Sequence, residues 1–362
     1  MSRRTGSGTC TDRTGAPLRP AVERPQRAES SIDHGAPRPR RPKIGIAPLG
    51  NRGKIVAMDK GDITPAVAAR LVAAQFPQWA DLPVVPVALD GWDNTTFRLG
   101  DELSVRLPSA DAYTAQIEKE HRWLPILARQ LPLPIPEPVA MGRPDGGFPR
   151  PWSIYRWIDG DHARVDRIAD LTVFAADLAG FLTALYSIDA SGGPSPGTHN
   201  FFRGGPVATY DTQSRGSIQL LADELDPEAT TEVWEAALAS TWDRSPVWAH
   251  GDVGASNLLV AGGDLRAVID FGCAAAGDPA CDLVMAWTFF AGESSEAFRS
   301  GLSFDDATWA RGRGWALWKA LITLAHEKVG GPDADAAARR FGWRIGAREV
   351  IELVLADHDG AA

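Results

Sequence analysis

Apolar and polar residues follow two different rhythms along this 362-residue chain, and the change comes near residue 159. Before that point, short apolar runs at 84–91, 95–100, 103–108 and 152–158 stand between turn-forming residues. Runs of this length, bounded by Gly, Asp and Asn, are typical of β-strands. The first three runs predict an antiparallel meander, and the fourth predicts a further strand that ends at the Asp-Gly-Asp of 159–161.

Two stretches in the same part of the chain carry helical spacing instead. Residues 62–76 combine an Asp or Thr cap with apolar residues three and four positions apart. Residues 110–129 place Ile117, Leu124 and Leu127 on one side of a helix. The segment 131–147 is rich in proline, and we predict neither a helix nor a strand there.

After residue 159 the pattern is mostly helical. Helices are predicted over 169–188, 230–240, 315–329 and 347–358. Residues 257–271 are the exception, because two apolar runs are joined there by Gly-Gly-Asp, the signal of a β-hairpin. We therefore expect an α+β fold, with a sheet-containing lobe over 58–158 and a larger helical lobe over 159–362.

Charge separates the first 57 residues from the rest of the chain. They hold 12 Lys and Arg against 4 Asp and Glu, a net charge of +8. The remaining residues hold 25 against 42, a net charge of −17, and the two parts sum to the −9 of the whole chain. Pro, Gly, Ser and Arg dominate this segment, and such a composition predicts a disordered basic extension. A start at Met58 is the simpler reading, and scattered prolines without aromatic residues speak against nucleic-acid binding.

The remaining composition excludes several protein classes. No apolar run reaches the roughly 18 residues that a membrane span needs. Three cysteines at positions 10, 273 and 281 fit neither a disulfide framework nor a zinc site. These features predict a soluble enzyme of the cytoplasm.

Three oxygen-bearing side chains meet at one end of the predicted hairpin. Asn257 leads into its first strand and Asp270 ends its second, and antiparallel pairing brings these two ends side by side. Asp252 lies in the loop just before them. Carboxylate and amide oxygens are ligands that Mg²⁺ accepts together with phosphate oxygens and water, so the sequence predicts a magnesium site here.

The spacing of these residues forms a longer pattern. It is H-G-D-x-x-x-x-N from 250 to 257, I-D-F-G from 269 to 272 and G-D-P-A-C-D from 277 to 282. The pattern resembles the aminoglycoside phosphotransferase family, the small-molecule branch of the protein-kinase-like fold, with choline, homoserine and fructosamine kinases as relatives. The resemblance extends over most of the chain from about residue 84 and implies a two-lobed kinase-like fold.

The resemblance also implies roles for single residues. Asp252 would orient the acceptor hydroxyl and accept its proton, while Asn257 and Asp270 would hold Mg²⁺. The loop of residues 90–100 would cover the nucleotide phosphates, with donors from Asn94 and Thr95; an ordinary hairpin turn explains these two residues equally well. Arg106 stands where the family usually has a phosphate-binding lysine, and an exposed strand arginine is the alternative.

Further positions complete the implied site. Glu120 on the following helix would pair with Arg106, with Glu118 as the second choice. Backbone groups between Tyr155 and Trp157 would hold the adenine, although an apolar core strand accounts for their side chains as well. His250 and Asp282 would brace the catalytic loop without taking part in chemistry. Asp278 reads as a helix cap, and the Trp-rich segment 311–322 as core or cleft lining.

The sequence thus predicts a kinase that transfers the γ-phosphoryl group of ATP or GTP, with Mg²⁺, to a hydroxyl of a small molecule, an antibiotic being one candidate. Two alternatives stay open: an idle nucleotide-binding protein, because Arg106 replaces lysine, and a hydrolase that uses Asp252 and Asp270 as an acid–base pair. The acidic balance of the folded part favours a cationic acceptor. Nothing in the pattern predicts nucleic acid or membrane as a partner.

Overall fold

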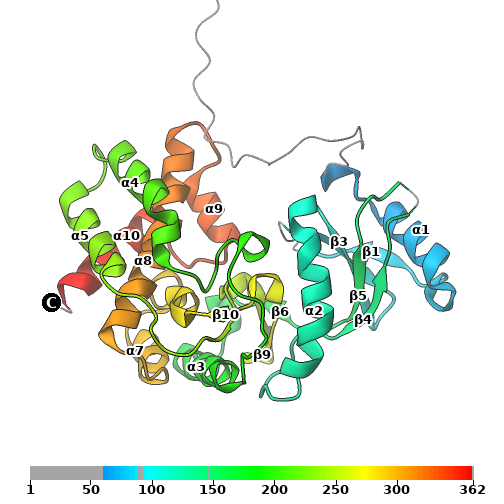
Figure 1. The fold of residues 1–362 in the computed structure, drawn as a ribbon. Coiled ribbons are helices and arrows are strands. Elements are labelled where there is room, and N and C mark those ends of the chain that lie inside the picture. Colours follow the sequence, from blue (N-terminus) through cyan, green and yellow to red (C-terminus); the bar gives the residue numbers. More distant parts are fainter. Residues whose placement is uncertain (1–59, 89–90, 92, 146, 361–362) are drawn as a thin grey trace, which may run out of the picture. The chain divides into compact units, whose positions relative to one another are not determined.

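A computed structural model describes residues 60–88, 91, 93–145 and 147–360, which belong to one compact unit spanning 55–362. The predicted basic extension of residues 1–57 and the predicted start at Met58 lie outside the described residues. The elements confirm the predicted α+β class, with a sheet-containing first part and a mostly helical second part (Figure 1).

The first part is built on a five-stranded antiparallel sheet. Its strands are β1 (Val84–Pro86), β2 (Asn94–Leu99), β3 (Leu103–Pro108), β4 (Pro138–Gly142) and β5 (Trp152–Arg156). Their order is β1-β2-β3-β5-β4, so the predicted meander forms and β5 pairs with β3. The run 84–91 is a shorter strand than predicted, because pairing with β2 ends at Pro86.

One strand of this sheet was not predicted. β4 lies within the proline-rich segment, where the sequence predicted no strand, and it begins at Pro138. Because proline cannot donate to a strand ladder, it is tolerated at the first residue of an edge strand, and β4 occupies the sheet edge. The prolines therefore concealed an edge strand.

Helix α1 (Pro65–Gln75) and helix α2 (Thr114–Leu127) accompany this sheet. Thr64 caps α1 by accepting a hydrogen bond from the Val67 amide, and Pro65 occupies the first helical position. Ile117, Leu124 and Leu127 are buried, as the spacing within 110–129 predicts. The inner face of α1 and the alternate residues of β2, β3 and β5 form one hydrophobic core.

The second part is mostly helical and has its own, larger core. Its helices are α3 (Leu171–Ser187), α4 (Asp211–Leu220), α5 (Pro227–Leu238), α6 (Met285–Thr288), α7 (Glu293–Ser300), α8 (Asp306–Lys328), α9 (Ala334–Arg340) and α10 (Ala347–Asp359). Four of them match predicted segments, and α8 begins nine residues before the predicted start at 315 because Asp305 caps it. Helices α4, α6, α7 and α9 were not predicted.

The predicted hairpin of residues 257–271 is present as β8 (Leu258–Ala261) and β9 (Asp264–Val268). Gly262 and Gly263 join the strands with φ of 65° and 96°, the left-handed conformations that a two-residue hairpin turn needs. The amide of Ile269 donates to the Asn257 carbonyl at 2.9 Å, so the two ends of the hairpin meet as predicted. Short strands β6 (Asp161–His162), β7 (Val247–Ala249) and β10 (Ala275–Gly277) flank it.

Short 3-10 helices link these elements at Lys60–Asp62, Pro77–Trp79, Asp111–Tyr113, Val165–Arg167, Thr198–Asn200, Val207–Tyr210, Ala255–Asn257, Phe271–Cys273 and Pro279–Val284. Asp278 caps the last of them by accepting from the Ala280 amide at 3.0 Å, as predicted. In the part of the chain that the structure describes, no helix has the length and apolar character to span a membrane.

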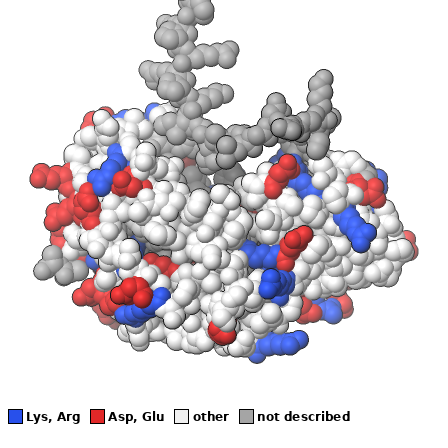
Figure 2. Space-filling model, in the orientation of Figure 1, with Lys and Arg blue, Asp and Glu red and all other residues white. Residues whose placement is uncertain are grey.

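Acidic side chains gather on the outer surface of the helical part. Figure 2 shows this concentration at the left of the molecule, where Figure 1 places α5. The exposed residues of the loop before α5 and of α5 itself include Asp223, Asp226, Glu228, Glu232 and Glu235. Part of the negative net charge therefore lies on an outer helical surface.

Candidate active site

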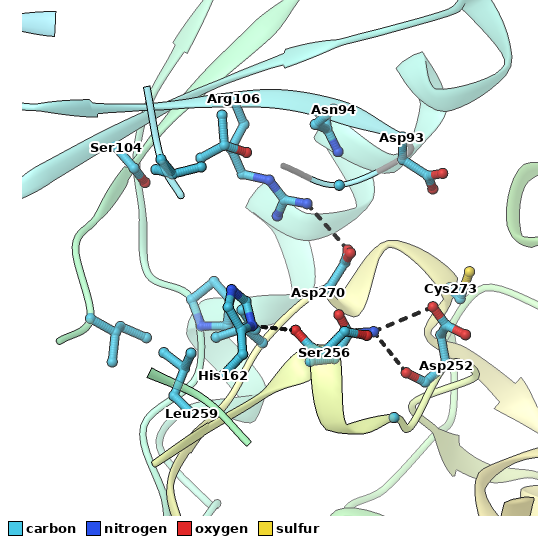
Figure 3. A pocket seen from close by; sticks show the side chains of 18 of the residues that line it. Asp93, Asn94, Ser104, Arg106, His162, Asp252, Ser256, Leu259, Asp270 and Cys273 are labelled. Atoms are coloured by element: carbon cyan, nitrogen blue, oxygen red, sulfur yellow. Dashed lines mark hydrogen bonds and ion pairs between the residues drawn. The ribbon is translucent and has the colours of Figure 1, made fainter. Parts of the chain in front are cut away.

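A cavity of about 280 Å³ lies between the sheet and the β8–β9 hairpin. Strands β2, β3 and β5 line one side of it, and the loop 252–257, the end of the hairpin and residues 319–343 line the other. Figure 3 shows Arg106 descending from β3 towards Asp270, with Asp252 and Cys273 at one end of the cavity and Ser104 and Leu259 at the other. Most of the predicted site residues therefore line one cavity, namely Asn94, Arg106, Tyr155, Trp157, Asp252, Asn257 and Asp270.

Arg106 joins the sheet to the hairpin. Its Nη2 donates to Asp270 Oδ1 at 3.2 Å, and its Nη1 lies 3.6 Å from Glu120 Oε1. Burial lowers the pKa of Arg106, but Glu120 and Asp270 outweigh that effect and raise the pKa above its ordinary value. The exposed position of Glu118 and the buried position of Glu120 select Glu120 as the partner.

Tyr155 holds the second oxygen of Glu120. Its hydroxyl donates to Glu120 Oε2, and the Arg106 guanidinium lies 5.4 Å from the centre of its ring. Burial keeps the pKa of Tyr155 well above its usual range, so the hydroxyl stays protonated and can donate. The side chain of Tyr155 therefore orients the Arg106–Glu120 pair, a function that the sequence did not indicate.

One expectation for the nucleotide side, the donor role of Thr95, needs correction. Thr95 points into the core beside Phe97, since alternate strand residues face opposite sides, and Thr96 lines the cavity instead. The amide of Trp157 already donates to the Glu102 carbonyl at 2.7 Å, which extends the β3–β5 ladder and removes that amide as an adenine donor. Asn94 lines the cavity as expected.

The loop that carries Asp252 is braced from below. Asp282 is buried, and its carboxylate accepts from the amides of His250 at 2.8 Å and Gly251 at 2.7 Å. The His250 ring lies 3.0 Å from the Ile269 carbonyl through Nε2 and 3.3 Å from the Asp252 amide through Nδ1. These partners assign the neutral Nε2-protonated tautomer and tie the loop to the residue before Asp270.

Asp252 and Asn257 are in direct contact. Asn257 Nδ2 donates to the Asp252 carbonyl at 2.9 Å and to its carboxylate Oδ2 at 3.3 Å. The amide nitrogen is thereby committed, and the amide oxygen is the atom that Asn257 can offer to a cation. Lys319, on α8, approaches Asp252 Oδ1 to 3.5 Å. Burial raises the pKa of Asp252, but Lys319 and Arg203 outweigh it and lower this pKa below its usual value.

Asp270 has a left-handed backbone, with φ of 64° and ψ of 66°. Aspartate tolerates this conformation better than most residues, and such strain persists only where neighbours fix it. Lys119 on α2 supplies part of that restraint, because its Nζ donates to the carbonyls of Gly272 at 2.6 Å and Ala274 at 3.0 Å. The turn after β9 is thus anchored to α2.

The sequence missed several residues that line the cavity or border it. Asp93 lines it with a carboxylate that accepts from Gln116 Nε2 at 3.0 Å, and burial raises its pKa to about 6. His162, Cys273, Lys319 and Phe341 line it as well. Lys319 follows Asp252 by 67 positions within a Trp-rich helix, so no local pattern links the two. Only the packing of α8 against the loop that carries Asp252 reveals this contact.

Comparison with known proteins identifies relatives of this arrangement. A family model described as a phosphotransferase enzyme family matches residues 84–315. The solved GDP and kanamycin complex of APH(2″)-IIia is similar with a TM-score of 0.56 and 19 % identity, over 82 % of this chain and 99 % of that one. No curated protein matches the sequence.

Two further solved structures share the fold. The streptomycin–ATP–APH(2″)-IIa ternary complex is similar with a TM-score of 0.51 and 18 % identity, over 79 % of this chain and 98 % of that chain. Macrolide 2′-phosphotransferase type I gives a TM-score of 0.51 and 19 % identity over the same shares of 79 % and 98 %. At these identities the likeness shows a common two-lobed fold.

Proposed function

The chain belongs to the phosphotransferase enzyme family, and on that premise we propose that it transfers the γ-phosphoryl group of ATP or GTP to a hydroxyl of a small molecule. The observation that carries the proposal is the arrangement of Arg106 between Glu120 and Asp270, in the same cavity as Asp252 and Asn257. The cavity is thus lined by a cation that can bind phosphate (Arg106), by two donors suited to magnesium (Asn257 and Asp270) and by a candidate base (Asp252).

Asp252 is the proposed base. Its carboxylate accepts the proton of the acceptor hydroxyl while that oxygen forms a bond to the γ-phosphorus. The bond from the γ-phosphorus to the bridging oxygen breaks, and the nucleoside diphosphate leaves with the electron pair. Phosphoryl transfer passes through a loose transition state, so orientation of the hydroxyl matters more than base strength. The lowered pKa of Asp252 suits this role, because Lys319 and Arg203 outweigh the effect of burial and keep the carboxylate ionised.

Arg106 is the proposed phosphate contact. A guanidinium stays charged and presents several donors in a plane, so it can hold a phosphate while keeping one donor on a carboxylate. Glu120 and Tyr155 fix its direction. The backbone groups near Asn94 and the Trp157 carbonyl remain the proposed contacts to the nucleotide, and Ile158, which also lines the cavity, is added to them.

The residues fit Mg²⁺ as an ion completed by its substrate. Asp270 offers a carboxylate. Asn257 offers its side-chain oxygen, because only its Nδ2 is used in the hydrogen bonds to Asp252. Among the described residues, no group of three or more His, Cys, Asp or Glu is arranged to hold a metal. Two protein donors suit magnesium, which takes phosphate oxygens and water for its other positions. When bound, the ion would neutralise charge on the transferred phosphate.

The relatives support a small hydroxyl compound as the acceptor. Their names include complexes with kanamycin and with streptomycin and ATP, and a macrolide 2′-phosphotransferase. These compounds differ in charge and shape, so they indicate a class of small-molecule ligands and leave the individual acceptor open. The charge of the acceptor is better argued from the residues beside Asp252.

The test is release of ADP or GDP across aminoglycosides, macrolides, sugars, amino alcohols and hydroxy acids. Asp252→Asn should lower turnover about 10²- to 10⁴-fold while Mg-nucleotide binding stays close to wild type. Asp264→Asn, at an exposed turn of the hairpin, is the matched control and should keep full activity. Nucleotide binding without turnover on any acceptor would favour the idle protein, and turnover without nucleotide would favour the hydrolase.

A further inference from the structure

The surroundings of Asp252 contain two cations to which the proposed reaction assigns no contact with a substrate. Lys319 lines the cavity, its side chain is 19 % exposed, and its Nζ lies 3.5 Å from Asp252 Oδ1. The same Nζ lies 4.7 Å from the centre of the Phe341 ring. An ammonium has three donors and one is directed to Asp252, so this group can receive a second anion.

Arg203 is the second cation. Its guanidinium lies 4.8 Å from the Trp318 ring and 5.2 Å from the Trp315 ring, and Tyr210 stacks on Trp318 at 4.0 Å. In the described part of the chain, no hydrogen-bond partner reaches its buried Nε. The aromatic rings orient the guanidinium without neutralising its charge.

The loop that holds Arg203 is fixed by several interactions. Asn200 is fully buried, and its Nδ2 donates to the carbonyls of Arg203 at 2.8 Å and Cys273 at 3.0 Å. Phe201 and Phe202 both have a φ of 54°, a left-handed conformation that is rare for bulky residues. A Cβ on Gly251 would lie 2.9 Å from the Arg203 Cβ, so Arg203 packs directly against the catalytic loop.

The local charge differs from the charge of the whole molecule. Near Asp252 the carboxylate is matched by Lys319 and accompanied by Arg203, whereas a concentration of acidic side chains lies on the outer surface around α5 (Figure 2). Asp93 adds one carboxylate from the sheet side of the cavity, where its Oδ2 accepts from Gln116. A polycationic acceptor would meet like charges at the reacting group, and this is unfavourable at short range.

Resting on the proposed function, we propose that Lys319 and Arg203 form an anion-binding subsite, and that the acceptor is a hydroxyl compound with a carboxylate or phosphate group close to the reacting hydroxyl. Lys319 binds that group directly from the cavity wall. Arg203 packs against Gly251 and is not part of the cavity lining, so it contributes positive potential without contacting the anion. This assignment reverses the expectation of a cationic acceptor that the net charge suggested.

The experiment uses four probes with the same three-carbon backbone on the full-length protein saturated with Mg²⁺ and a non-hydrolysable ATP analogue, which fills the phosphate positions of the nucleotide site. The probes are glycerol, glycerate, glycerol 3-phosphate and 3-amino-1,2-propanediol. Binding is followed by calorimetry and by tryptophan fluorescence, since Trp315 and Trp318 lie beside Arg203. We expect at least one anionic probe to bind about tenfold or more tightly than glycerol, because a hydrogen bond to a charged group is worth that much. Comparison of glycerate with glycerol 3-phosphate tells which anion is preferred.

Three variants identify the residue responsible. Lys319→Met should abolish the preference for the anion, Lys319→Arg should retain most of it, and Lys328→Met, near the exposed end of the same helix, should leave it unchanged. Tighter binding of the amine, or an equal or undetectable response to all four probes, overturns the proposal. A loss of turnover in Lys319→Met with the anion preference intact also overturns it, because Lys319 would then only position Asp252.

Failure of this inference can be told apart from failure of the proposed function. Binding of the Mg-nucleotide and the effect of Asp252→Asn on turnover test the phosphotransferase reaction alone. An enzyme that passes those tests but prefers glycerol or the amine keeps its function and loses the anion subsite. An anion preference in a protein without turnover keeps the subsite and removes the reaction.

Discussion

Arg106 illustrates how one residue sets the geometry of the site. A lysine in its place would be a point charge, whereas the guanidinium reaches Glu120 and Asp270 with two different nitrogens. The sequence indicated the substitution and the charge, but only the tertiary structure shows that Glu120 of α2 and Asp270 after β9 share one cation. The departure from lysine therefore creates a link between the sheet and the hairpin.

The first prediction concerns that link. Arg106→Met leaves Glu120 buried without its cation, and breaking a buried pair costs about 3 kcal/mol of unfolding free energy. Arg106→Lys should cost less and should raise the KM for the nucleotide several-fold. Urea unfolding measures the first effect, and steady-state kinetics the second. Glu120→Gln in the Arg106→Met background should recover part of the lost stability; no recovery would show that Glu120 is not the main partner.

The second prediction concerns Asp93, whose pKa burial raises to about 6. The folded protein then binds this proton more tightly than the unfolded chain, so stability is lost as the pH rises from about 4 through 6. Asp93→Asn removes the buried charge and keeps an acceptor for Gln116. It should raise the free energy of unfolding at pH 7.5 by roughly 2 kcal/mol, with little gain at pH 4.

Chemical unfolding at both pH values measures the difference. Asp101→Asn in an exposed turn is the control for the loss of one negative charge. If Asp93→Asn changed the free energy of unfolding equally at both pH values, the ionised Asp93 carboxylate would not destabilise the folded protein, and the prediction would be wrong.

At the scale of elements, local sequence patterns predicted the secondary structure that depends on neighbouring residues. The hairpin, the meander and four helices follow from apolar spacing and turn residues, and the meeting of Asn257 with the end of β9 follows from antiparallel pairing. Helices such as α4 and α7 are short and polar on most sides, so their spacing carries little signal. The contact of Lys319 with Asp252 joins elements 67 residues apart, and no period in the sequence encodes it.

The catalytic loop itself gives the third prediction. Gly251 has φ of 84°, and a Cβ there would lie 2.5 Å from the Cys273 carbonyl, whereas Gly262 has φ of 65° and open space around it. Gly262→Ala should therefore lower the free energy of unfolding by only about 1 kcal/mol, because a left-handed backbone is unfavourable for alanine. Gly251→Ala adds overpacking and should cost about 3 kcal/mol in total and lower turnover strongly. Equal unfolding free energies for the two variants would contradict the close approach of loop and Cys273.

For the whole molecule, the two hydrophobic cores are connected at the site by polar contacts. Arg106 reaches Asp270, and Lys119 reaches the carbonyls of Gly272 and Ala274. A nucleotide that binds between the sheet and the hairpin adds to these contacts, and a ligand that binds only the folded state stabilises the entire cooperative unit. Thermal unfolding thus reports binding at the site without any acceptor.

The last prediction uses this linkage to test the metal donors. Mg-ATP at about 100 times its Kd should stabilise the fold by about 2.7 kcal/mol, which corresponds to a Tm increase of roughly 5 °C. ATP with a chelator, or Mg²⁺ alone, should give a much smaller shift, because Asn257 and Asp270 supply only two of the ion's ligands. Asp270→Asn should remove the dependence of the ATP shift on magnesium. Since this change also weakens the contact with Arg106, the ligand-induced shift is compared within each variant rather than between absolute Tm values. A chelator that leaves the ATP shift of the wild type intact would exclude the metal role of both residues, while a GTP shift larger than the ATP shift would identify the preferred donor.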